Sequence, residues 1–83
     1  MPNPTVRRER ILADNGDGTV TEVFRSIRQN GDRSEMVFYR ESGGAKLLIW
    51  HVVYEAGGLL VHGPHEKFRG KGVETVWPPK GYE

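Results

Sequence analysis

The three histidines of this chain are its best candidates for chemistry, and they lie close together in the sequence. His51, His62 and His65 fall within fifteen residues. Histidine is the side chain whose ordinary pKa, about 6.5, lets it accept and donate protons near neutral pH, and neutral imidazole is also a common metal ligand. Two imidazoles in one site could therefore serve as a general base and a general acid.

Cleavage of RNA without a metal needs this set of groups. One imidazole removes the proton from the 2′-hydroxyl, a second donates a proton to the leaving oxygen, and Lys or Arg stabilises the charge of the phosphorane. We expect His51 or His62 to be the base and His65 the acid, with Glu66 beside them in the catalytic set. The residues expected to bind substrate are Lys67, Arg69 and Lys71, for phosphate, and Trp50 and Tyr54, for stacking on a base.

Two other roles for the histidines stay open. His62, His65 and Glu66 offer two imidazoles three residues apart plus a carboxylate, and His51 could complete a three-histidine zinc set with an open position for water. This spacing differs from the zincin pattern of two histidines four apart on one helix, so we expect no metal and no other cofactor. His51 could also be a core histidine with one satisfied hydrogen bond.

The elements that must position these residues are strands. Turn signals rich in Gly, Asn and Asp recur at residues 14–18, 30–32, 42–44 and 56–58, and such residues supply the positive φ angles of tight hairpins. No window keeps an apolar repeat at helical spacing over three turns. The segments between the turns, rich in Val, Ile, Thr, Tyr and Phe, predict strands at residues 5–13, 19–28, 34–40, 45–55 and 59–62.

These segments predict a mainly β fold, a five-stranded antiparallel meander, because short connections favour neighbouring antiparallel strands. Apolar residues on both faces indicate a strongly curved sheet or partial barrel, covered in part by the C-terminal tail, by the far end of the sheet or by a partner subunit. A short helical turn is expected near residues 64–69, with Pro64 in its first turn and Gly70 as its stop. A short edge strand is expected at residues 73–77, with Trp77 docking the tail onto the sheet.

The hairpin that joins the last two predicted strands decides whether the imidazoles meet. With Gly57 and Gly58 as a two-residue loop, His51 and His62 become diagonal neighbours on one face. With a loop at residues 56–57 they face each other directly. A three-residue loop, residues 56–58, turns His62 to the other face, because each single-residue shift reverses the side chains of a strand.

Size and composition restrict the class of protein. The chain has 83 residues, so we expect one domain, residues 1–83, with a small core. It has no cysteine, which excludes disulfides and thiolate metal sites. Its net charge of +1 offers no global electrostatic argument for nucleic acid. Neither a bilayer-spanning apolar run nor a signal peptide is recognisable, so we expect a soluble, cytoplasmic protein without a membrane partner.

The last forty or so residues, with Val61-His62-Gly63-Pro64-His65-Glu66-Lys67-Phe68 and an end rich in Lys, Gly, Pro and Trp, resemble the small ribonuclease-type toxin domains of bacterial polymorphic toxins and toxin–antitoxin modules. The resemblance implies a β-rich nuclease with catalytic His and basic partners, RNA as substrate, and a cognate antitoxin or immunity protein. The chain departs from those domains in its low net charge and in lacking an N-terminal helix. The alternative class is a non-catalytic β-rich binding module, a homo-oligomer that buries apolar residues left over from a single sheet.

Overall fold

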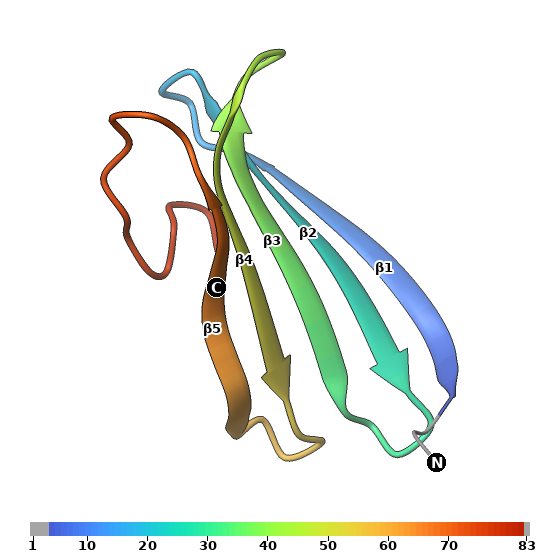
Figure 1. Cartoon of the computed structure of the whole chain (residues 1–83). Helices are drawn as coiled ribbons and strands as arrows, with labels where there is room; N and C mark the ends of the chain where they lie inside the picture. Colours follow the sequence, from blue (N-terminus) through green and yellow to red (C-terminus); the bar gives the residue numbers. More distant parts are fainter. Residues whose placement is uncertain (1–3, 83) are drawn as a thin grey trace.

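The computed structural model describes residues 4–82 and contains five strands in a single antiparallel sheet (Figure 1). Residues 1–3 and 83 of the expected domain lie outside the described part. The sheet has the order β1-β2-β3-β4-β5, so every strand pairs with its neighbours in sequence. The sheet is curved and open, with β1 and β5 at its edges, and the predicted meander is confirmed. The strands are β1 (Thr5–Asp14), β2 (Thr19–Arg28), β3 (Arg33–Glu41), β4 (Lys46–Tyr54) and β5 (Leu60–Arg69).

Each of the four hairpins is closed by a hydrogen bond of the same type. In each of them the N–H of the residue before a three-residue loop donates to the carbonyl oxygen of the residue after it, at 2.8 to 3.0 Å. The loops are residues 16–18, 29–31, 42–44 and 56–58, and each contains a glycine with positive φ. These loops fall at the turn signals of the sequence, because only residues that accept a positive φ close such short connections without strain.

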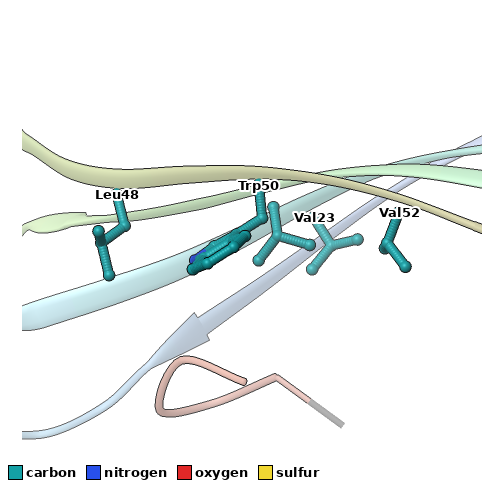
Figure 2. Close-up of a cluster of buried hydrophobic side chains, with 5 residues drawn as sticks. Val23, Leu48, Trp50 and Val52 are labelled. Atoms are coloured by element: carbon teal, nitrogen blue, oxygen red, sulfur yellow. The ribbon is translucent and has the colours of Figure 1, made fainter. Parts of the chain in front are cut away.

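One face of the sheet holds the core. Val37, Leu48 and Val52 are fully buried, and Trp50 and Val23 nearly so. Figure 2 shows the side chains of Val23, Leu48, Trp50 and Val52 on the same side of the sheet. They come from alternate positions of β4 and from residues paired with them on neighbouring strands, as the two-residue period of a strand requires. We call this surface the tail-covered face.

The segment that follows β5, residues 70–82, covers this face. The ring centroids of Trp77 and Trp50 lie 5.3 Å apart, which confirms that Trp77 docks the tail on the sheet. The carbonyl oxygen of Lys80 accepts a hydrogen bond from the Thr21 hydroxyl. The short edge strand expected at residues 73–77 is wrong, since these residues are irregular and are held by side-chain packing.

The helical turn expected near residues 64–69 is also wrong. These residues continue β5, which pairs with β4 as far as the partners Leu48 and Arg69. The edge of β4 offers backbone partners along this whole stretch, whereas a single helical turn leaves most of its N–H and C=O groups unpaired. Residues 4–82 contain no helix, and thus no helix in this part of the chain could span a membrane.

Candidate active site

The register between β4 and β5 brings His62 toward His51 by an irregular route. The loop has three residues, because the Glu55 N–H donates to the Leu59 carbonyl oxygen. A loop of this length by itself would turn His62 to the other face. Tyr54 then pairs with Leu60, but Val53 pairs with His62, so Val61 is an extra residue on β5. This irregularity has the form of a β-bulge and restores the parity that a two-residue loop would have produced.

A second irregularity turns His65 to the same face. Residues three apart in a regular strand point to opposite sides of the sheet. Here His62 pairs with Val53 and His65 pairs with His51, so that Gly63 and Pro64 together lie opposite Val52. The extra residue reverses the parity again and places all three imidazoles on the face opposite the core. We call this surface the imidazole face.

The three rings form a contiguous cluster. The ring centroids of His51 and His62 lie 5.9 Å apart, and those of His62 and His65 lie 4.4 Å apart. His62 and His65 are exposed, whereas His51 is half-buried. Ser34, on the neighbouring strand β3, is hydrogen-bonded through Oγ to His51 Nε2 at 3.0 Å, which orients that ring. The imidazoles therefore converge on one place that is open to solvent.

The surroundings of His51 favour its neutral form. Partial burial lowers the pKa of His51 below its ordinary value of 6.5, and the nearby positive charges of Lys67, His62 and His65 lower it further. His51 is therefore a neutral imidazole at pH 7, able to accept a proton. Lys67, one of the residues predicted to bind substrate, lies near this cluster. It is an extra residue of β5, between the partners of Trp50 and Ile49.

Most other predicted site residues lie elsewhere. Trp50 is buried in the core, and the Tyr54 hydroxyl is hydrogen-bonded to the Tyr82 hydroxyl at 2.9 Å on the same tail-covered face. Neither ring can stack on a base held at the imidazoles. Glu66 and Arg69 pair with Trp50 and Leu48 and thus point to the tail-covered face. Lys71 lies in the turn beyond the end of β5.

This arrangement does not support the metal alternative. Among residues 4–82 no group of three or more His, Asp or Glu side chains is placed to hold a metal ion. Glu66, the carboxylate of the hypothetical set, faces Trp50 on the opposite side of the sheet from the imidazoles.

The imidazole face also carries residues that the sequence analysis did not assign to a site. Met36 pairs with His51 and Phe24 pairs with Met36, so these two continue the row of imidazoles across the sheet. In the adjacent row, Phe38 pairs with Glu22 on one side and with Ile49 on the other, and Phe68 pairs with Ile49. The alternation of Met36 and Phe38 along their strand was visible in the sequence, but their neighbours on other strands follow only from the register.

Gly63 is the backbone position on which the cluster depends. Its φ is +83°, and a Cβ there would lie 2.5 Å from the His51 carbonyl oxygen and 2.9 Å from His65 N. We expect Gly63→Ala to lower the free energy of unfolding by about 2 kcal/mol, measured by urea denaturation, through strain and steric conflict together. Gly58→Ala is the matched control, because Gly58 has a φ of +91° and open space around it.

A smaller loss, about 1 kcal/mol, is expected for the control. Equal losses for the two variants would contradict a steric role for Gly63. The imidazole signals in an NMR spectrum should move in Gly63→Ala and stay in place in Gly58→Ala, because only Gly63 lies in the irregular segment between His62 and His65.

The cluster combines a neutral imidazole oriented by a hydroxyl, two exposed imidazoles and a lysine, all reachable from solvent. Such a set can move protons between groups of a bound molecule and can bind an anion. Comparisons with known protein families, with curated proteins and with solved structures find no match to this chain.

Proposed function

We propose that this protein is a metal-independent endoribonuclease of the toxin type, which cleaves RNA by histidine general acid–base catalysis. The observation that supports the proposal is the convergence of His51, His62 and His65 on one exposed surface beside Lys67. Acid–base cleavage requires two proton-transfer groups within reach of one phosphodiester. A toxin of this kind needs a cognate antitoxin or immunity protein in the cell that makes it.

In the proposed reaction His51 is the base and His65 the acid. His51 takes the proton of the ribose 2′-hydroxyl, the 2′-oxygen forms a bond to phosphorus, and the bond from phosphorus to the 5′-oxygen breaks. His65 gives its proton to that 5′-oxygen, so the products are a 2′,3′-cyclic phosphate and a 5′-hydroxyl. In this proposal Lys67 and His62 stabilise the charge on the non-bridging oxygens.

His51 suits the role of base for two reasons. Its lowered pKa keeps it neutral and able to accept a proton at pH 7. In the tautomer whose Nε2–H donates to Ser34 Oγ, the other nitrogen, Nδ1, carries the lone pair that accepts the proton. The Ser34 hydroxyl then orients the base, as the third group of a catalytic triad does.

A labelled single-stranded RNA tests the proposal directly. We expect the purified protein to cleave it equally well with and without a chelator, and to leave an otherwise identical fully 2′-O-methylated strand intact, because that strand has no 2′-hydroxyl to deprotonate. The control is a protein with all three histidines replaced by glutamine, purified in the same way, which should be inactive.

The other outcomes lead to the competing classes. Cleavage that a chelator abolishes would contradict the proposal and favour a metal site. Absence of any cleavage would favour a non-catalytic binding or oligomerisation module. A specific observation favours that second candidate, since Phe24 and Phe68 on the imidazole face remain 42% and 43% exposed, and association with a second copy of the chain would bury them.

A further inference from the structure

We infer that the imidazole face is a stacking platform for unpaired bases, and that the substrate class is single-stranded RNA with its bases laid on Phe24 and Phe68 beside the imidazoles. The inference deepens the proposed function and rests on it for the position of the scissile phosphate. It assigns a ligand to a sheet surface that the C-terminal segment leaves open.

The aromatic residues flank the imidazoles on two sides. Phe24 lies in the same cross-strand row as His51 and His65, with Met36 between it and His51. Two strand spacings, or about 10 Å, separate Phe24 from His51. Phe68 lies one row away from His65 on the same face, since its partner Ile49 is two residues from His51. A strand whose phosphate sits at the imidazoles thus has an aromatic ring available on two sides.

Both rings are accessible, and the Phe24 ring is held by a neighbouring aromatic residue. Phe24 packs edge-on against Phe38, with ring centroids 5.4 Å apart and an interplanar angle of 86°. Phe24 and Phe68 are nevertheless about two-fifths exposed. An exposed, preoriented ring stacks on a base at little entropic cost, and stacking accepts any base because each has a π face.

The positive charges on the imidazole face favour a polyanionic ligand over an apolar protein surface. Arg10 and Arg40 share a single carboxylate, that of Glu22, whose distance to Arg40 is 3.9 Å. Lys46 Nζ lies 5.7 Å from the centroid of the Phe38 ring, and Lys67 lies close enough to His51 to lower its pKa. Cations interleaved with aromatic rings are the usual means by which proteins bind single strands. Duplex RNA stacks its bases internally and would leave Phe24 and Phe68 without partners.

A strand that binds but cannot be cleaved tests the stacking inference separately from catalysis. The probe is a fluorescein-labelled, fully 2′-O-methylated single strand of about twelve nucleotides, measured by fluorescence anisotropy at one fixed salt concentration. We expect Phe24→Leu and Phe68→Leu each to weaken binding by about tenfold, because leucine keeps the apolar contact and loses the π face. The same strand annealed to its complement should bind at least about tenfold more weakly than the single strand to the wild-type protein.

Leu60→Ala is the matched control. Leu60 is as exposed as the two phenylalanines, at 48%, but pairs with Tyr54 and points to the tail-covered face. Its binding should equal that of the wild type. Unfolding midpoints measured by circular dichroism check that the variants stay folded, and the Phe→Leu changes preserve most of the buried apolar area for that purpose.

Several results would overturn the inference. Wild-type affinity in both phenylalanine variants would do so, as would equal affinity for the single strand and the duplex. A wild-type protein that fails to bind and sediments as a dimer would assign the face to a second copy of the chain. If natural RNA is cleaved and the phenylalanine variants bind as the wild type does, the stacking inference is wrong and the catalytic proposal stands. If the protein binds the single strand tightly but does not cleave natural RNA, only the catalytic proposal is wrong.

Discussion

His65→Gln should reduce the rate of RNA cleavage by about two to four orders of magnitude, the usual contribution of a general acid or base. The proposed reaction needs a proton on the 5′-oxygen as its bond to phosphorus breaks, and glutamine cannot supply one. His51→Gln should cause a loss of the same order because the 2′-hydroxyl then keeps its proton. Single-turnover cleavage of a labelled strand measures both effects.

Stability and a distant variant serve as controls for this result. His65 is exposed, so His65→Gln should leave the unfolding midpoint close to that of the wild type. Glu74→Gln, at an exposed position of the C-terminal segment, should cleave at the wild-type rate. A loss smaller than about tenfold in both histidine variants would mean that neither imidazole is an essential proton carrier.

The pH dependence of cleavage provides an independent test of the base. The rate should rise as His51 loses its proton, and because the pKa of His51 is lowered, the midpoint of this rise should lie below pH 6.5. Lys67→Met removes one of the positive charges that lower the pKa and should move the midpoint to higher pH. An acid limb centred above pH 6.5 in the wild-type protein would contradict the assignment of His51.

Glu35→Ala should destabilise the protein by about 3 kcal/mol, the largest loss of stability we expect from a change outside the apolar core. Only 1% of Glu35 is exposed. Its carboxylate accepts a hydrogen bond from Arg25 Nε at 2.6 Å and another from the Tyr82 hydroxyl, which in turn is bonded to Tyr54. The variant leaves the Arg25 guanidinium half-buried without its closest partner and releases the end of the C-terminal segment.

Glu9→Ala is the matched control for this variant. Glu9 also pairs with Arg25, at 3.2 Å, but 25% of its side chain is exposed, against 1% for Glu35. Ion pairs that stay in contact with solvent contribute about 0 to 1 kcal/mol, so this variant should lose about 1 kcal/mol or less. Urea denaturation measures both free energies of unfolding. Similar losses would show that burial of the Glu35 carboxylate is not what makes it important.

The Arg25 side chain reports the same interaction. Burial by itself lowers the pKa of Arg25, but hydrogen bonds and charges from Glu35 and Glu9 outweigh it and raise the pKa overall. A charged guanidinium held between two carboxylates joins β1, β2 and β3 on the tail-covered face. Tyr82 links this group to the C-terminal segment, so sheet and tail should unfold together.

Local residue types were sufficient to predict the meander. The four turn signals lie at the four hairpin loops, because few residues other than glycine accept the positive φ that such loops need. The order of strands followed from the shortness of those loops. The clustering of His51, His62 and His65 in sequence likewise identified the region of the candidate site, since residues in one hairpin cannot move far apart.

Which side chains share a face depends on strand pairing across the whole hairpin. The three-residue loop at residues 56–58 would separate His51 from His62, and the extra residue Val61 reverses that outcome. A second reversal at residues 63–64 adds His65 to the cluster. Because side chains in a strand alternate with a period of two, each inserted residue exchanges the faces of all that follow. Turn chemistry can predict a loop, but the bulges depend on pairing with the whole of β4.

The same reason explains the residues that sequence reasoning misplaced. Trp50 and Glu66 are adjacent in sequence to histidines of the cluster, and adjacency in a strand puts them on the opposite face. The contacts of Glu35 with Arg25 and Tyr82 join residues up to 47 positions apart, and no local sequence pattern predicts these contacts. Local sequence patterns are therefore enough to predict the strands and the region of the imidazoles. The side chains around the imidazoles depend on the strand register and on the docking of the C-terminal segment.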